Sequence, residues 1–498
     1  MPLSPYQQLE QEFKRLSAFQ GASGILRWDA AVMMPRGSAD MRGEQLAALE
    51  TEAHSILTSP RVARLLERAE ANSQGMDDWQ AANLREMRRE REHAIAMPQN
   101  LISRIAKATA RAEVKWLEAK EKSDFKVFAP HLEEVTSLVR DKGRILGKAL
   151  QLDPYDALVD EFSPGLTSAE IDVVFTTLGR RLPGLIYEVI ELQATRPPLE
   201  ITGKFTANRQ RQLAVDLMKA MGFPFDRGRL DESEHPFTGG VPGDIRITTK
   251  FSSTDPLTGL MGVLHETGHA MYDVGLPEVW RGQPVGRDRG MALQESQSLL
   301  LEMLICRNRP FLRYVQPLLQ KAFGVAGPEW DVENLYRLLI RVRRGLIRID
   351  ADELTYPLHV MLRYELEKEL LAGELRIKDI PEAWNARMDA RLGVKPGNDA
   401  EGCLQDVHWA VGSFGYFPSY AIGAVIAAQL YETLRAELPQ IDEDIAAGRF
   451  EALFAWLREN VHGLGASLST PELIKQATDK PLTAAAWVRY VEAKYLES

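Results

Sequence analysis

Apolar residues recur every three or four positions along most of this chain. The spacing holds through nearly every segment of residues 6–196 and is clearest at 105–122 and 128–150. It is the period of an α-helix that buries one face. The pattern therefore predicts a helical N-terminal half, which the pair Pro197-Pro198 interrupts before one more helix at 206–221.

The pattern changes between residues 228 and 252. Gly-Gly and Pro-Gly pairs stand there beside the alternating run D-I-R-I-T-T at 244–249, which is typical of a half-buried β-strand. We expect a β-hairpin or a small sheet at this place. Beyond it, 275–290 is rich in glycine and proline and predicts a loop, and 291–307 predicts an apolar helix.

No repeat, low-complexity tract or shift in composition marks a domain boundary. We therefore expect a mainly α protein that forms a single unit over residues 1–498. Within that unit, 1–196 is the helical N-terminal half, and 197–498 carries the motifs that follow.

A helix start and two histidines come directly after the expected sheet. Asp255 suits the N-cap and Pro256 the first helical position. Residues four apart share one helix face with about 5–6 Å between their Cβ atoms, so His265 and His269 can reach one ion. With Glu266 they form H-E-x-x-H, the signature of zinc peptidases. This helix therefore predicts a metal site.

A catalytic zinc site needs a third protein ligand and an open position for water. The acids downstream are the candidates: Asp273, Glu278, Glu295 and Glu302. We select Glu295, because it begins an apolar helix and lies 26 residues beyond His269, enough for a loop and an antiparallel return. Asp273, one turn beyond His269, is better placed to orient an imidazole. Small residues would let the two helices pack closely: Gly262, Gly268, Ala292 and Ser298.

Glu266 is adjacent to a ligand and is free for another task. Its carboxylate can take a proton from water held by the metal and pass it to the leaving amine. The metal lowers the pKa of that water to about 7 and polarises the scissile carbonyl. We expect one Zn2+ per chain, although the same donors also accept Co2+ or Mn2+.

Further polar residues stand in two stretches that can contact a substrate. His235 precedes the expected sheet, while Asp244 and Arg246 share one strand face and can pair with each other or with substrate. Arg348 lies in a run otherwise able to be buried. A guanidinium there can bind a carboxylate by paired hydrogen bonds, or it can form a buried ion pair with Asp350 or Asp352.

Two later stretches add groups that can donate hydrogen bonds. The run Q-D-V-H-W at 405–409 places His408 beside an acid and an indole. The run G-Y-F-P-S-Y at 415–420 places Tyr416 and Tyr420 at a helix start, where a phenol can donate to an oxyanion.

Composition narrows the class of protein. The chain is 45% hydrophobic and 26% charged, as in soluble globular proteins, and its net charge of −10 argues against nucleic-acid binding. Cys306 and Cys403 match neither a disulfide framework nor a metal-binding pair, which fits a reducing compartment. Neither a leader pattern nor an 18-residue apolar window is present. We expect a cytoplasmic protein without a membrane or nucleic-acid partner.

Taken together, these motifs resemble those of the carboxypeptidase Taq family, in the family's order and over most of the chain. The matching motifs are H-P-F at 235–237, D-x-R-x-T at 244–248, H-E-x-x-H at 265–269, the E-S-Q of H-E-S-Q at 295–297, I-R-x-x-A-D at 347–352 and G-x-x-Q-D-x-H-W at 402–409. One position departs: Gln294 stands where the family usually has a histidine.

The resemblance implies a mostly helical catalytic unit with a deep groove, one wall of which is the N-terminal half, and usually a homodimer. It implies release of single residues from peptide C-termini with broad preference, except for proline. We expect Arg348, or else Arg246, to bind the terminal carboxylate. Donors to the tetrahedral oxyanion and further substrate contacts complete the expected site: His408, Tyr420, His235, Tyr416 and Asp244.

Two other functions fit the same metal helix. A helical zinc endopeptidase or dipeptidase would differ in its cleavage products, and a non-catalytic helical scaffold would keep the metal ligands without activity.

Overall fold

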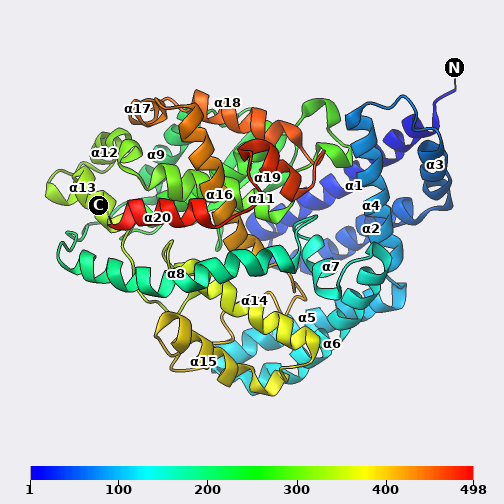
Figure 1. Ribbon diagram of the computed structural model, residues 1–498, viewed down its shortest axis with the longest axis horizontal. Helices are drawn as coiled ribbons and strands as arrows, with labels where there is room; N and C mark the ends of the chain where they lie inside the picture. Colours follow the sequence, from blue (N-terminus) through cyan, green and yellow to red (C-terminus); the bar gives the residue numbers. More distant parts are fainter. Residues whose placement is uncertain (1, 497–498) are drawn as a thin grey trace.

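Helices make up most of the computed structural model, which describes residues 2–496 (Figure 1). The prediction of a mainly α protein is confirmed. The helices of the first part are α1 (Pro5–Val32), α2 (Ala39–Thr58), α3 (Pro60–Ala71), α4 (Asp78–Ala96), α5 (Gln99–Lys122), α6 (Phe125–Leu150), α7 (Pro154–Asp160) and α8 (Ser168–Ala194). The two stretches with the clearest apolar spacing lie in α5 and α6.

A small sheet lies between α9 and α10. These elements are α9 (Ala207–Ala220), β1 (Gly228–Glu232), β2 (Phe237–Val241), β3 (Asp244–Thr249) and α10 (Pro256–Gly275). Strand β3 is central, with β1 parallel and β2 antiparallel to it. The expected small sheet is present, and only its β2–β3 part is a hairpin. The alternation along β3 turns Ile245 and Ile247 into the core that the sheet shares with α9 and α10.

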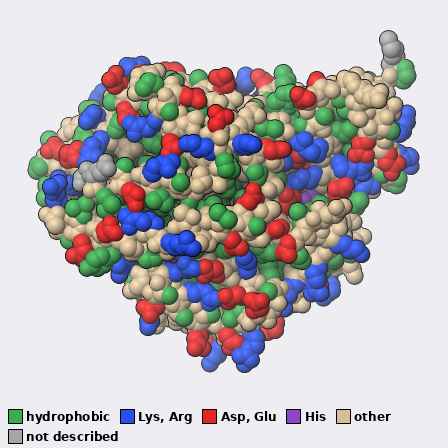
Figure 2. All heavy atoms as spheres, in the orientation of Figure 1, with side chains coloured by type: hydrophobic (Ala, Val, Ile, Leu, Met, Phe, Trp, Pro, Cys, Tyr) green, Lys and Arg blue, Asp and Glu red, His purple; other side chains and the backbone are tan. Residues whose placement is uncertain are grey.

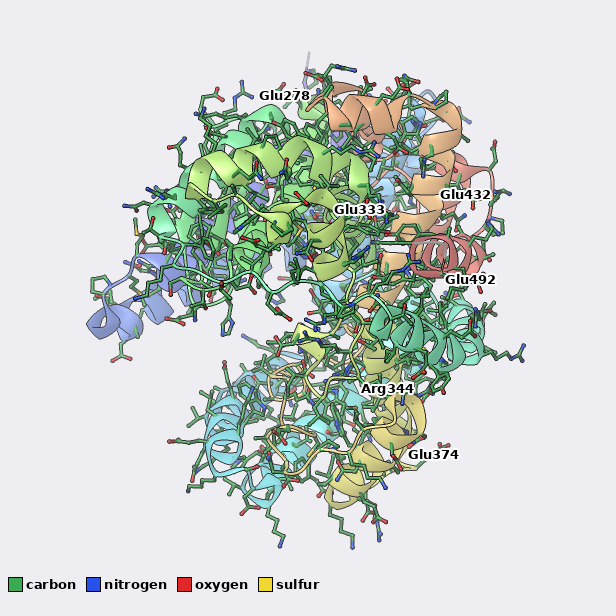
Figure 3. All side chains as sticks on the ribbon, turned by 90° about the vertical axis from the view of Figure 1, so that its left-hand side faces the viewer. Glu278, Glu333, Arg344, Glu374, Glu432 and Glu492 are labelled. Atoms are coloured by element: carbon green, nitrogen blue, oxygen red, sulfur yellow. The ribbon has the colours of Figure 1, made fainter. Side chains whose placement is uncertain are left out.

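Helices continue to the end of the described chain. They are α11 (Met291–Leu299), η4 (Leu300–Cys306), α12 (Arg309–Phe323), α13 (Val332–Leu339), α14 (Tyr356–Ala372), α15 (Ile380–Leu392), α16 (Pro418–Glu437), α17 (Ile441–Ala446), α18 (Glu451–Asn460), α19 (Thr470–Thr478) and α20 (Ala485–Leu496). Helices α5, α6, α14 and α15 lie together in the lower part of Figure 1, and α1–α4 lie at its right edge. The view at right angles again separates the cyan and yellow helices below from the green and orange ones above (Figure 3).

Three groups of buried apolar side chains hold these elements together. The largest extends from Leu101 on α5 to Tyr495 on α20 and so joins both halves of the sequence. A separate group lies on α1–α4. The third packs the sheet against α9 and α10, with Ile247 against Val263 in the same cluster. The sheet thereby fixes the position of α10.

Small residues bring α10, α11 and α16 into close contact. A methyl group on Gly268 would lie 2.6 Å from Cα of Ser298 on α11, and one on Gly423 of α16 would lie 2.8 Å from Cβ of Glu295. Glycine permits such close backbone approach because it has no Cβ. The prediction of close packing between α10 and α11 is confirmed for this pair, whereas Gly262 faces Thr249 of the sheet instead.

The helix that begins with α11 widens after Leu299. Residues Leu300–Cys306 form a π-helix, η4, in which hydrogen bonds span five residues instead of four. The expected apolar helix at 291–307 is present, and its second half is a π-helix. A wider turn changes the direction of each following side chain, which matters for Glu302 below.

The charged surface, the helix hydrophobicity and the cysteines were each the subject of an expectation from the sequence. On the face in Figure 2, basic and acidic side chains are interspersed. No helix within residues 2–496 is long and apolar enough to cross a bilayer. Cys306 and Cys403 are buried free thiols.

Candidate metal centre and active site

Helix α10, which carries the two histidines, has a capped N-terminus. Asp255 accepts hydrogen bonds of 3.1 Å from two backbone N–H groups of the first turn, and Pro256 follows it. The predicted N-cap is confirmed. One turn apart, the rings of His265 and His269 lie 5.0 Å apart between their centroids and 76° from parallel.

Glu295 reaches these histidines from α11. Its Oε2 lies 3.6 Å from Nε2 of His269 and 4.0 Å from Nε2 of His265. The three side chains offer ligand atoms that all lie within 4.8 Å of one another, and within the described residues they are the one cluster that could hold a metal ion. Two imidazole nitrogens and a carboxylate oxygen match the donor set of a catalytic zinc site with one position open.

Each histidine is oriented by a hydrogen bond at its other nitrogen. Nδ1 of His265 donates to Oε2 of Glu302 at 2.9 Å, and Nδ1 of His269 donates to Oε1 of Gln294 at 3.1 Å. The amide of Gln294 in turn donates to Asp273 at 3.0 Å. A proton on Nδ1 leaves the lone pair on Nε2, on the side of Glu295. Asp273 thus acts on the imidazole through Gln294.

The pKa values of the three candidate ligands are shifted by burial and by the neighbouring charges. Burial, with the charges of Glu266 and Glu302, raises the pKa of Glu295 to about 7. Burial lowers the pKa of His269 to about 3. Burial also opposes a charged His265, but the hydrogen bond with Glu302 and the charges of Glu295, Glu302 and Glu266 together outweigh it and raise the pKa to about 10. A divalent cation would supply the positive charge that protons otherwise bring, so donors and charges both fit a metal.

Glu266 is adjacent to the candidate ligand His265, and one of its carboxylate oxygens accepts a hydrogen bond from the sheet. It is 7% exposed, and the hydroxyl of Thr238 on β2 donates to its Oε2 at 2.7 Å. Burial raises its pKa. The sheet therefore positions this carboxylate as well as the metal helix.

Arg348 is buried, but its neighbours and its ion-pair partner differ from those that the sequence indicated. It is 6% exposed, whereas its neighbour Ile349 is 72% exposed, so the expected buried apolar run is wrong. Residues 348–350 form a single 3-10 turn, which points successive side chains in different directions. The alternative ion pair with Asp350 or Asp352 is also wrong, because Nε and Nη2 of Arg348 both donate to Oδ1 of Asp406, at 2.9 and 2.7 Å.

Asp406 binds a second arginine. Nε of Arg363 donates to its other oxygen at 2.6 Å, and Oε1 of Gln405 accepts from Nη2 of Arg363 and from the backbone N–H of Arg348. Burial disfavours the Asp406 carboxylate, but the two guanidinium charges hold its pKa well below the usual range. We call these four residues the arginine cluster. It carries two positive charges and one negative charge.

An aromatic group lies against this cluster. The guanidinium of Arg348 lies 4.8 Å from the ring centre of Tyr420, whose hydroxyl is 3.2 Å from Nε2 of His408. Tyr416 lies 5.2 Å from Tyr420 between ring centres. Burial raises the pKa of Tyr420 to about 12 and lowers that of His408 to about 4, so both stay neutral near pH 7. The charge of Glu295 acts on both tyrosines, which places this group next to the metal centre.

The remaining predicted residues lie on the sheet. Arg246 donates to both oxygens of Asp244, at 2.9 and 2.6 Å, and lies 4.6 Å above the ring centre of Trp28. The pairing of these two residues with each other was one of the predicted alternatives. His235 is exposed, and its hydrogen bonds to Ser233 and Thr248 are made by its backbone carbonyl.

Four residues of the site were not singled out from the sequence. They are Thr238, Tyr356, Arg363 and, as a partner of Arg348, Asp406. Thr238 directly follows H-P-F, and Asp406 lies inside Q-D-x-H-W, so their motifs carried a signal. Tyr356 and Arg363 belong to the buried helix α14, where a polar residue among apolar ones gives no indication of its partner.

Two histidines and a glutamate on packed helices, with a buried arginine beside them, define a helical metallopeptidase. The family model for carboxypeptidase Taq (M32) metallopeptidases matches residues 8–495. Thermostable carboxypeptidase 1 of Thermus thermophilus is 35% identical over 99% of both chains, and carboxypeptidase 1 of Bacillus subtilis is 34% identical over 98% of both. The solved Trypanosoma cruzi metallocarboxypeptidase 1 superposes with a TM-score of 0.96 at 41% identity over 99% of both chains. The chain therefore belongs to the carboxypeptidase Taq (M32) family and is a metallocarboxypeptidase.

Proposed function

We propose that this enzyme binds one Zn2+ per chain through His265, His269 and Glu295 and releases single amino acids from free peptide C-termini, with broad preference except for proline. The observation that carries the proposal is the position of Arg348. Its guanidinium is buried 4.8 Å from the ring centre of Tyr420, and its charge opposes the rise that burial causes in the pKa of Glu295. Both observations support a site in which one C-terminal residue contacts the guanidinium and the metal. Carboxylate recognition beside the metal selects an exopeptidase.

Bound zinc supplies a Lewis acid that polarises the scissile carbonyl and lowers the pKa of water to about 7. Glu266 acts as the general base, taking a proton from the attacking water and delivering it to the leaving amine. Thr238 occupies Oε2 of Glu266, which leaves Oε1 for the proton. The raised pKa of Glu266 favours the first transfer, because the carboxylate accepts a proton more readily.

Arg348 binds the terminal carboxylate with the part of its guanidinium that Asp406 does not use. Nε and Nη2 are engaged, while Nη1 has only the Tyr356 hydroxyl at 3.5 Å. The hydroxyl of Tyr420 and the neutral imidazole of His408 donate to the oxyanion as it forms. Tyr416 lines the same space, and Asp244, Arg246 and His235 contact the substrate from the sheet side.

A peptide and its C-terminally amidated twin, followed by mass spectrometry with metal-loaded enzyme, test the proposal. Free amino acids should appear in order from the C-terminus of the first peptide. Arg348→Ala should raise KM for the free peptide about tenfold or more and change it little for the amidated one. Arg343→Ala, at an exposed arginine that has no part in the proposed site, is the matched control and should have a small effect on both peptides.

Other outcomes identify the alternatives. Internal fragments would indicate an endopeptidase, and equal losses on both peptides in Arg348→Ala would remove the carboxylate role. Metal-loaded protein without activity on any peptide would indicate a scaffold.

We further propose that residues 1–498 act as one catalytic unit with a deep groove, that the enzyme is a homodimer, and that it works in the cytoplasm. The largest core joins both halves of the chain, which supports the single unit. Light scattering on the purified enzyme measures its mass, and a monomer mass would contradict the dimer.

A further inference from the structure

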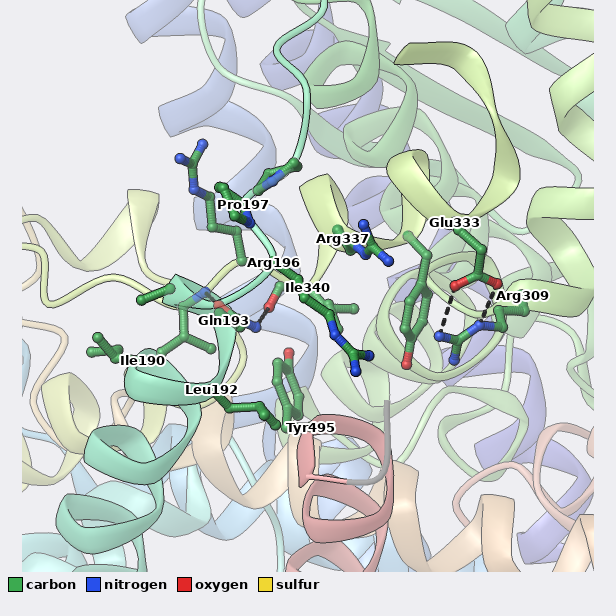
Figure 4. Close-up of a pocket in the computed structure, with 15 residues that line it drawn as sticks. Ile190, Leu192, Gln193, Arg196, Pro197, Arg309, Glu333, Arg337, Ile340 and Tyr495 are labelled. Carbon is green, nitrogen blue, oxygen red and sulfur yellow. Dashed lines mark hydrogen bonds and ion pairs between the residues drawn. The ribbon is translucent and has the colours of Figure 1, made fainter. Parts of the chain in front are cut away.

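A cavity of about 270 Å3 lies between the end of α8, helices α12 and α13, and α20. It shares no residue with the metal centre or the arginine cluster. Figure 4 shows Arg337 between Ile340 and the Arg309–Glu333 pair, with Tyr495 below them. Its lining is Ile190, Leu192, Gln193, Ala194, Arg196, Pro197, Pro198, Arg309, Glu333, Tyr336, Arg337, Ile340, Arg341, Val342 and Tyr495.

The walls of this cavity are held in place. The side chain of Gln193 bridges the facing segment, donating to the backbone oxygen of Ile340 and accepting from the N–H of Val342, both at 2.9 Å. Tyr495 donates to Glu353 at 3.0 Å. A cavity whose walls are already fixed needs little rearrangement to bind a ligand.

Positive charge exceeds negative charge in the lining. Four arginines face one acid, Glu333. Arg309 is taken up by both oxygens of Glu333, at 2.8 and 2.9 Å, and Arg341 pairs with Glu200 outside the cavity at 2.7 Å. For the guanidinium groups of Arg196 and Arg337, the described residues offer neither a hydrogen bond nor an ion pair. The charge of Arg337 contributes to the lowered pKa of Glu333, but the oxygens of that acid are bonded to Arg309. Within residues 2–496, positive charge in the lining therefore remains without a bonded anion, on the exposed Arg196 and Arg337.

Apolar side chains make up much of the rest of the lining. Ile340 and Val342 are 3% and 4% exposed, and Leu192 and the prolines of the α8–α9 linker also line the cavity. A guanidinium prefers a planar carboxylate, which it binds by paired hydrogen bonds, while apolar walls favour a hydrocarbon portion. The volume is below the usual range for drug-sized ligands, about 300–1,000 Å3. We propose that this cavity binds a small organic carboxylate with a branched or cyclic apolar body, with Arg337 as the main anchor.

Isovalerate is a suitable probe, because it combines one carboxylate with a branched apolar group. Its neutral isostere isovaleramide and inorganic phosphate separate the two requirements. We expect saturable binding of isovalerate by titration calorimetry and weaker binding of the other two. Equal binding of phosphate would overturn the organic assignment, and equal binding of the amide would overturn the role of charge.

Variants locate the site. Arg337→Gln should weaken isovalerate binding about tenfold or more, as expected for loss of a charge-assisted hydrogen bond. Arg343→Gln removes another exposed arginine that does not line the cavity and should leave the affinity unchanged. Arg348→Gln should leave it unchanged as well. Binding that is lost in Arg348→Gln and kept in Arg337→Gln would place the ligand in the active site and overturn the proposal, as would the absence of saturable binding.

Discussion

The metal centre and the arginine cluster lie next to each other and are built in opposite ways. The metal centre takes its ligands from α10 and α11, two helices that pack through Gly268 and Ser298. The arginine cluster takes its members from a 3-10 turn, from α14 and from a loop at 405–406. One is fixed by helix geometry, and the other by ion pairs between distant segments.

Their charges are also opposite. Three buried glutamates surround the two histidines, and Arg307 pairs with one of them, Glu302, so the metal centre carries more negative than positive charge. Two arginines share Asp406, so the arginine cluster lacks an anion. In the proposed mechanism, a peptide C-terminus supplies that anion and the bound metal ion supplies the cation. The difference teaches that each region is electrostatically complete only when the enzyme is loaded, and the variants below test each side separately.

Glu266→Gln should have the largest effect, a fall in kcat without a change in substrate or metal binding. Loss of a general base lowers kcat about 10²–10⁴-fold, while the three ligands and Arg348 remain, so KM and metal content should stay near those of the wild type. Steady-state kinetics with metal analysis measure both. Full activity in this variant would refute the general-base assignment.

Asp406→Asn should disrupt the arginine cluster and lower the free energy of unfolding. Two buried guanidinium groups would lose their shared carboxylate, and breaking a buried ion pair costs about 3–5 kcal/mol in free energy of unfolding. Denaturant unfolding measures the change. Asp350→Asn, an exposed acid two residues from Arg348, is the control and should cost less than about 0.5 kcal/mol. Equal costs would contradict the role of Asp406.

Gln294→Leu should weaken the metal centre without touching a ligand. It removes the hydrogen bonds to His269 and Asp273, and loss of such outer partners lowers metal affinity about 10–100-fold. Chelator competition measures the affinity. Gln294→His, which restores the family's usual residue, should retain most of it, and an unchanged affinity in the leucine variant would show that the relay does not orient His269.

His462→Gln should have the smallest effect, seen only in the pH dependence of stability. The imidazole of His462 is buried against Gly275 of α10, and burial lowers its pKa to about 3. The unfolded chain binds this proton with a pKa of about 6.5. The neutral side chain therefore contributes stability that is present above about pH 6.5 and is lost as the pH falls from there toward about 3.

Replacing His462 by glutamine removes this titration and keeps a donor for Gln297, which lies 2.9 Å from Nε2. The slope of unfolding free energy against pH should decrease by at most about 1.4 kcal/mol per pH unit within that window. An unchanged slope would mean that the buried histidine is not neutral.

The same contrast explains what the sequence could predict. The N-cap Asp255, the spacing of His265 and His269, and the small residues around Glu295 are local features of helices, so they define the metal centre without a structure. Asp406 lies 58 residues from Arg348, and no local pattern connects them. The sequence therefore singled out Arg348 partly for a wrong reason, a buried apolar run, and named the wrong acid as its partner.

Departures from regular secondary structure account for the other errors. Glu302 was one of the downstream acids considered as a third ligand, and in η4 its carboxylate accepts from Nδ1 of His265 instead. The parallel pairing of β1 with β3 was also missed, because strand order depends on packing against α9 and α10.

The π-helix Leu300–Cys306 has a consequence for the evolution and engineering of this enzyme. Deleting one residue there would restore 3.6 residues per turn and rotate the flanking segments by about 100° relative to each other. Either Glu302 would leave His265, or the chain beyond Cys306 would lose its packing. This short stretch of ordinary residue types should therefore tolerate substitutions more readily than any change in length.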